Sequence, residues 1–409
     1  MHMRAGFGIW ELTPPMGIEL AGYGYYLGRC ALSVRDPLYA RAVMIEADNT
    51  RALVISCDLL GLSKKVCAEV FRHAEKYGVA EENVIIVSIH THTGPCIKYH
   101  EGCGYADDAY VATVGGLICR AVDAAAADLC EVTGLTQVCQ AFEGDHIYNR
   151  TVEDGPVDRL LRGFTLTRAG QKPIAMVSAA CHGVFRGRVT AVSADFAGEI
   201  CRIMGDKGYE AIYLNGLCGD IDPYKPTDER LCEFAQIAVE AFHAEHKELP
   251  LTIQAGKIPF TLKLTPVTAE DIRGAAAQTV ERAGGPEIPA ARVALTWEKE
   301  MLAKLDTLTD TEEICGKYLI LGGVPVLALP IEGFTKIGQE VRRITGREDC
   351  LVLGCGEELL GYLPTKDDIA RGAYAALEST FLYKRLPVVP GEAERLGEAM
   401  GEALDVILG

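Results

Sequence analysis

Val84-Ile-Ile-Val-Ser-Ile-His90-Thr-His92-Thr-Gly-Pro95 is the stretch on which the fold prediction rests. Its apolar, β-branched start predicts a buried strand, and the Gly-Pro pair ends that strand. Side chains alternate between the two faces of a strand, so we expect His90 and His92 on the same side, at the carboxyl end. Two such imidazoles can share a metal ion, or act as one ligand and one acid or base. A plain hydrogen-bonded pair of histidines is the alternative.

Composition narrows the class of protein. The chain has 409 residues, of which 49% are hydrophobic, enough for a large buried core. Its net charge of −17 argues against nucleic acid and anionic lipid as partners. The fifteen cysteines are dispersed without CxxC pairs, which predicts neither a disulfide framework nor a cysteine zinc site and favours the cytoplasm. No apolar run is long enough to span a bilayer, so we expect a soluble protein without stable membrane insertion.

The segments around the histidine stretch alternate between strand and helix patterns. Strands are predicted at 42–46 and 52–57, and a helix at 63–77 leads back to the histidine strand. This order predicts an α/β fold, with a mixed β-sheet core, flanking helices and the metal site at the carboxyl ends of strands. No linker interrupts the pattern, so residues 1–409 are expected to form a single catalytic domain. The region 226–312 has the pattern of a peripheral insertion of helices and a strand.

A second histidine follows a second buried strand. The predicted strand 173–181 ends in His182-Gly183, which repeats the geometry of the first histidine stretch. The Gly- and Tyr-rich segment 21–28 predicts a loop that either covers the core edge or forms a pocket wall. His243 and His246 lie on a predicted helix among acidic residues, and we expect them at the surface.

Several short motifs occur in one order along the chain. They are GIWELTPP with AGYG, HTHTGP, YNR, CHG followed by SADF, NGLCGDIDP, PIEGFTKIG and GYLPTKDDIARGAY. In this order they resemble the neutral/alkaline non-lysosomal ceramidases, zinc-dependent hydrolases of the N-acyl bond of ceramide, from Gly6 to about Ser379. The resemblance implies a zinc ion held by His90, His182, Glu332 and Tyr362. It also implies that the substrate carbonyl and leaving group are handled by His92, Arg150 and Tyr374.

The residue types are compatible with this assignment. Two imidazoles and a carboxylate are a usual catalytic zinc set, which leaves a position for water and lowers its pKa toward about 7. A phenol is a less usual ligand, because its free pKa is about 10. Each residue also has a plain structural alternative: a helix cap for Glu332, a pocket aromatic role for Tyr362, and an ion pair with Asp154 or Asp158 for Arg150.

The chain also departs from the family pattern. Ile331 stands where the family has glycine, and Asp222 stands where Ser or Asn is common, so a hydroxyl nucleophile does not transfer to this position. The signal peptide and C-terminal β-sandwich domain of secreted ceramidases are missing, which predicts a short cytoplasmic member. We therefore expect a zinc-dependent hydrolase that uses metal-activated water to cleave a linear amide (N-acyl) bond, in a small or polar substrate rather than ceramide. The alternatives are a lipid amidase acting on ceramide, an ester or lactone hydrolase, and a non-catalytic zinc-containing binding protein.

Overall fold

Two β-sheets form the centre of the molecule in the computed structural model, which describes residues 2–98 and 102–409. The larger sheet has the order β11-β9-β8-β6-β1-β3-β4-β5, with β13 beside β6. Its strands are β1 (Met3–Glu11), β3 (Tyr39–Ala47), β4 (Thr50–Cys57), β5 (Val84–Ser88), β6 (Cys130–Ala141), β8 (Leu160–Arg168), β9 (Ile174–Ala179), β11 (Glu210–Asn215) and β13 (Lys247–Glu248). The β4–β5 and β9–β11 pairs are parallel and the other pairs antiparallel, so the sheet is mixed as predicted.

The smaller sheet packs on one face of the larger one. It consists of β14 (Ile253–Lys263), β15 (Thr311–Leu321), β16 (Val324–Ala328) and β18 (Leu351–Leu353). Ile85 of β5 belongs to the apolar cluster that joins the two sheets, whereas its neighbour Ile86 belongs to the cluster on the opposite face. Because both faces are buried, the strand is apolar from residue 84 to residue 87 and does not alternate with polar residues.

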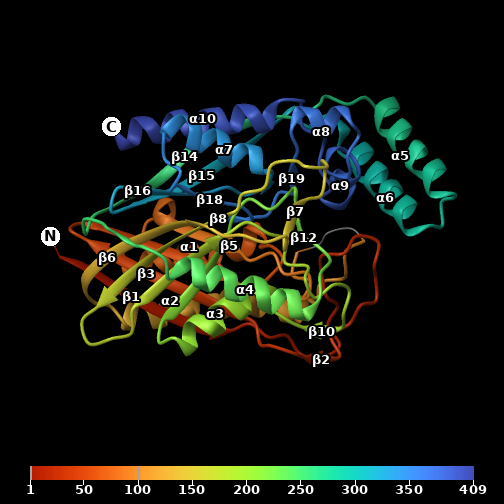
Figure 1. The fold of residues 1–409 in the computed structure, drawn as a ribbon. Helices are drawn as coiled ribbons and strands as arrows, with labels where there is room; N and C mark the ends of the chain where they lie inside the picture. The colour runs from red at the N-terminus through yellow and green to blue at the C-terminus, as the bar shows by residue number, and fades with distance from the viewer. Residues whose placement is uncertain (1, 99–101) are drawn as a thin grey trace.

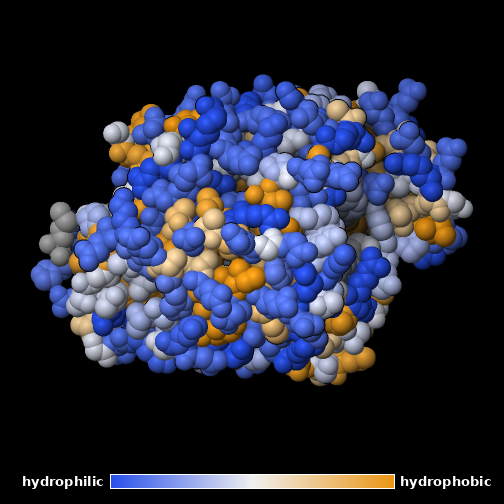
Figure 2. Space-filling model, viewed as in Figure 1, coloured by the Kyte–Doolittle hydropathy of each residue, from blue (hydrophilic) through white to orange (hydrophobic). Residues whose placement is uncertain are grey.

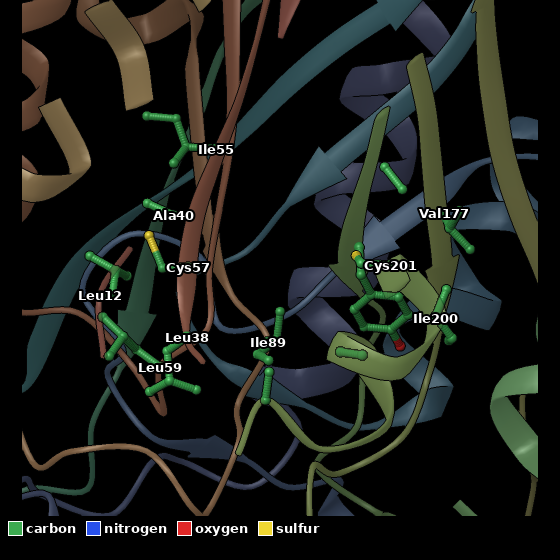
Figure 3. Close-up of a cluster of buried hydrophobic side chains, with 14 of the residues drawn as sticks. Leu12, Leu38, Ala40, Ile55, Cys57, Leu59, Ile89, Val177, Ile200 and Cys201 are labelled. Atoms are coloured by element: carbon green, nitrogen blue, oxygen red, sulfur yellow. The ribbon is translucent and has the colours of Figure 1, made fainter. Parts of the chain in front are cut away.

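Helices cover the two outer faces, so the fold has four layers (Figure 1). The larger sheet is covered by α1 (Lys64–Ala74), α2 (Asp108–Ala127), α3 (Asp195–Asp206) and α4 (Asp228–Phe242), and the smaller one by α7 (Thr335–Thr345) and α10 (Glu392–Leu408). Ile55 and Val177 from the larger sheet lie in one apolar cluster with Ile200 of α3, part of which is shown in Figure 3. The predicted fold class is confirmed.

The region 226–312 is only partly peripheral. The helices α5 (Ala269–Ala283) and α6 (Pro289–Ala303) lie together at one end of the molecule (Figure 1). In contrast, β14 pairs with β15 along its whole length and is an integral strand of the smaller sheet. The strand expected in this region is therefore the edge strand of the smaller sheet, because sequence alternation predicts a strand but not which sheet it joins.

Short elements connect the sheets to the loops above their edge. The short strands are β2 (Ser33–Val34), β7 (Ile147–Asn149), β10 (Ala191–Val192), β12 (Ile221–Pro223), β17 (Glu332–Gly333) and β19 (Tyr362–Leu363). The short helices are α8 (Lys366–Ala370), α9 (Glu378–Leu382), η1 (Glu75–Tyr77), η2 (Glu81–Asn83), η3 (Leu305–Thr307) and η4 (Tyr374–Ala376). The β7–β12 and β17–β19 pairs bring distant motifs side by side.

Helix α2 is long and apolar enough to cross a membrane by length and composition alone. In this fold it packs on the larger sheet and contributes Val114, Ile118 and Val122 to the core. The face of the molecule in Figure 2 is mostly hydrophilic, with apolar residues gathered in small separate patches. One side of α2 is thus buried against the sheet as a core helix.

Candidate metal centre

The first histidine stretch turns sharply where the sequence predicts a continuing strand. Strand β5 ends at Ser88, and His90 has a left-handed backbone with φ of 63°. Strand alternation therefore does not place the two imidazoles, although their ring centroids lie 5.0 Å apart as the prediction of proximity requires. The His92 N–H donates to the Gly183 carbonyl at 3.0 Å. A Cβ on Gly183 would lie 2.7 Å from the His90 carbonyl oxygen, so only glycine allows the two histidine turns to meet.

Three acceptor atoms converge at the centre of the site. The Nδ1 atoms of His90 and His182 lie 2.7 Å and 3.1 Å from backbone carbonyls, those of Leu60 and Ile221. A neutral imidazole that donates through Nδ1 carries its lone pair on Nε2. Both Nε2 atoms face the same carboxylate oxygen, Oε2 of Glu332, at 3.1 Å for His90 and 3.3 Å for His182. All three side chains are almost fully buried.

This convergence requires a positive charge between the acceptors. Burial alone would raise the pKa of Glu332, but the His90 and His182 imidazoles outweigh it and hold the pKa of this carboxyl well below its usual range. Without a metal ion, the charge has to be an extra proton on an imidazole. The alternative role of Glu332 as a helix cap is wrong, since Asp220 Oδ1 accepts from the Thr335 N–H at the start of α7 instead. The donor set fits a divalent cation.

The phenol of Tyr362 borders the same centre. The parallel β17–β19 pair sets Glu332 beside Tyr362, and the phenolic oxygen lies 3.4 Å from His182 Nε2. Burial raises the pKa of Tyr362 well above 10, and the nearby Arg150 guanidinium opposes this shift only in part. With Arg150 alone beside it, the phenol therefore keeps its proton, and a metal cation would be needed to favour the phenolate. A purely packing role as a pocket aromatic does not account for the polar surroundings of its hydroxyl.

Arg150 lies behind Tyr362. Its Nη2 donates to the Tyr362 hydroxyl at 2.9 Å, and its Nη1 lies 3.3 Å from Asp222 Oδ1. The predicted alternative of an ion pair with Asp154 or Asp158 is wrong: Asp158 pairs with Arg162 and Arg342, and Asp154 forms no ion pair with Arg150 within the described residues. The guanidinium therefore reaches the edge of the metal centre.

The His92 ring lies beside these groups and has no hydrogen-bond partner for either nitrogen among the described residues. Burial and the neighbouring imidazoles of His90 and His182 lower its pKa well below 6.5, so it is neutral. The nitrogens of these three histidines lie within 4.8 Å of one another, so the trio can bind a metal ion. An unpartnered neutral imidazole is also suited to accepting a proton from a bound water molecule.

Two further tyrosines complete the site. Tyr374 packs its ring against that of Tyr362 with centroids 6.0 Å apart. Burial of its hydroxyl raises the pKa of Tyr374 well above 10, although 41% of the residue's surface is exposed. Tyr383, which no motif indicated, donates its hydroxyl to Oε1 of Glu332. Tyr383 follows directly after α9, so the position of this helix brings its hydroxyl to Glu332. The sequence around Tyr383 carries no motif that predicts this contact.

These side chains enclose a cavity of about 20 Å³, which is room for one water molecule or ion. Its lining comprises Gly22, Leu60, His90, His92, Cys103, Glu332, Tyr362, Tyr374, Leu382 and Tyr383. Gly22 belongs to the Gly- and Tyr-rich loop, and a Cβ at this position would lie 2.5 Å from the His92 ring. The loop therefore forms a wall of the cavity, which was one of its two predicted roles.

The remaining sequence candidates lie elsewhere. His243 is exposed at the end of α4, as predicted, and His246 is half-buried beside it. Both imidazoles bond to backbone carbonyls of α4, Val239 for His243 and Phe242 for His246. Neither histidine reaches the metal centre.

Comparisons with known proteins agree with the resemblance in the motifs. Residues 3–143 match the family model described as neutral/alkaline non-lysosomal ceramidase, N-terminal. No curated protein matches the sequence. Among solved structures, neutral ceramidase from Pseudomonas aeruginosa is similar with a TM-score of 0.76 and 16% identity, over 100% of this chain and 75% of that one. A ceramidase complexed with C2 is similar with a TM-score of 0.74 and 15% identity, over 100% of this chain and 76% of that one. The predicted family resemblance is confirmed.

Proposed function

We propose that this member of the neutral/alkaline ceramidase family is a zinc-dependent hydrolase that cleaves a linear N-acyl (amide) bond. One observation carries the proposal: His90 Nε2 and His182 Nε2 both face Glu332 Oε2 at hydrogen-bond distance, while each Nδ1 faces a backbone carbonyl. A cation between these acceptors satisfies all of them. We assign the metal site to His90, His182, Glu332 and Tyr362.

A zinc ion, when bound, would lower the pKa of a water molecule toward about 7 and polarise an acyl carbonyl. His92 then accepts the proton of the attacking water and later delivers it to the leaving amine, because its imidazole is neutral and beside the ligands. The Tyr374 hydroxyl, a neutral donor at the cavity, stabilises the negative charge that develops on the carbonyl oxygen. Arg150 orients the substrate from the side of Tyr362.

The net charge of −17 supports a small or polar substrate rather than ceramide in a membrane. The acidic surface gives no electrostatic attraction to anionic lipid. We therefore propose a soluble N-acyl compound as the substrate and, from the cysteine content, the cytoplasm as the compartment.

Metal analysis and a substrate panel test the proposal together. Protein purified without added metal should contain about one zinc per chain, and His182→Ala should lose most of it. The panel should contain short-chain N-acyl amines, ceramide, and esters and lactones of matched acyl chains. Turnover of the short amides alone supports the proposal. Preferred turnover of ceramide would indicate a lipid amidase instead, and preferred turnover of an ester or lactone would indicate an ester or lactone hydrolase. Stoichiometric zinc without turnover of any compound would indicate a binding protein.

A further inference from the structure

Asp222 is a charged residue at the metal centre to which the proposed function gives no role. It lies on β12 opposite Tyr148 of β7, and 23% of its side chain is exposed. A single oxygen, Oδ1, lies 3.3 Å from Arg150 Nη1 and 3.5 Å from His182 Nδ1. This oxygen is buried and makes no hydrogen bond of good geometry. The Asp222 carboxylate thus lies close to both Arg150 and His182.

Arg150 leaves only one end of its guanidinium for this carboxylate. Its Nη2 donates to the Tyr362 hydroxyl and to the Gly219 carbonyl, each at 2.9 Å. Its Nε also faces Gly219, at 3.3 Å. Nη1 meets Asp222 by charge attraction, and because the guanidinium is planar, this attraction adds to the Gly219 contacts in setting the direction in which Nη2 meets the phenol. Asp222 therefore acts on Tyr362 through Arg150.

Oδ1 of Asp222 also acts on His182. Its Nδ1 lies 3.1 Å from the Ile221 carbonyl, the shorter of its two contacts, so the hydrogen bond belongs to the backbone. The Asp222 charge adds electrostatic attraction for the same N–H, which favours the tautomer with its lone pair on Nε2. Carboxylates placed behind metal-binding histidines commonly work in this way.

We propose that Asp222 is a positioning residue that couples two metal ligands of the centre, His182 directly and Tyr362 through Arg150. The inference rests on the proposed function, because it assumes that these residues bind zinc. It differs from that function in assigning part of the zinc affinity to a residue that does not touch the metal. Loss of one such partner typically weakens metal binding about 10–100-fold.

The test compares Asp222→Asn, which keeps the shape and removes the charge, with Asp222→Glu, which keeps the charge. Glu153→Gln is the matched control, because Glu153 is exposed and forms no ion pair in the described part of the chain. Competition with a chromogenic chelator measures the zinc dissociation constant of each full-length protein. We expect Asp222→Asn to weaken zinc binding about 10–100-fold, Asp222→Glu to restore part of the loss, and Glu153→Gln to match wild type.

The visible spectrum of the cobalt(II)-substituted protein supplies a second readout, since it reports ligand geometry without any substrate. It should change in Asp222→Asn and remain unchanged in Glu153→Gln. Asp222→Ser offers the same comparison with a smaller side chain, so the test does not depend on the folding of one variant. Wild-type affinity and an unchanged cobalt spectrum in the folded Asn and Ser variants would overturn the inference. Failure of wild-type protein to bind zinc would instead overturn the proposed function.

Discussion

Replacing Glu332 by glutamine removes a negative charge from the centre of the site and keeps the shape of the side chain. The carbonyl oxygen of glutamine can still accept from the Tyr383 hydroxyl, as Oε1 does now. The other oxygen, however, faces His90 Nε2 and His182 Nε2, and its replacement by a neutral group removes an anionic zinc ligand. The fold should therefore persist while zinc binding weakens.

The size of the loss follows from burial and ligand number. Structural zinc sites with four protein ligands are bound by about 10–16 kcal/mol, so an even share is about 2.5–4 kcal/mol per ligand. Glu332 is 1% exposed, which means that water does not screen its charge and the share needs no reduction. Since 1.4 kcal/mol is a factor of ten, the zinc dissociation constant should rise about 10²–10³-fold.

Chelator competition at constant pH measures this constant, and circular dichroism checks the fold. Glu340→Gln on α7 is the matched control, because Glu340 loses the same charge but pairs only with Arg343 at the surface among the described residues. A Glu332→Gln protein that is folded and binds zinc within about threefold of wild type would refute the reasoning, as the carboxylate would then not be a ligand.

Three further predictions concern catalysis and stability. His92→Ala should retain zinc and lower the turnover number about 10²–10⁴-fold. Loss of zinc in this variant, measured by elemental analysis, would show that His92 is a ligand instead. Tyr374→Phe should lower kcat and kcat/KM equally, by about 10²–10³, and wild-type kcat in steady-state assays would remove the residue from the mechanism. Burial raises the pKa of Asp195 to about 6. The folded state then binds more protons than the unfolded chain between about pH 4 and 6. This group therefore lowers the free energy of unfolding by about 2–3 kcal/mol as pH rises through that window. Urea unfolding of Asp195→Asn at pH 4 and 7 should lack this contribution, and an unchanged pH dependence would contradict the assignment.

The residues predicted from the motifs lie close together in the structure. The alternation of side chains along a strand, however, does not explain their positions. His90 and His92 were expected together from strand alternation, whereas the chain leaves the strand at Ser88 and turns at His90 with φ of 63°. The turn at His90 packs directly against Gly183, which lies far along the chain, and a side chain at position 183 would collide with it. A periodicity rule describes regular backbone only, and this turn is irregular.

What the sequence by itself determined was the class of fold and the candidates for the site. Apolar strands buried on both faces, alternating with helices, require a layered α/β structure, because such strands can be covered only from both sides. The motifs indicated five of the residues that line the cavity, namely His90, His92, Glu332, Tyr362 and Tyr374. Both are read from the order of residues along the chain, so they can be recognised before any contact is known.

Tertiary structure decided which atoms face one another. His182 and Glu332 are separated by 150 positions, and only the packed sheets bring Nε2 and Oε2 to 3.3 Å. The same holds for the contact of Tyr383 with Glu332 and for that of Asp222 with Arg150. A charge at this depth acts on whichever groups packing places within a few ångströms, and a linear pattern does not encode those distances.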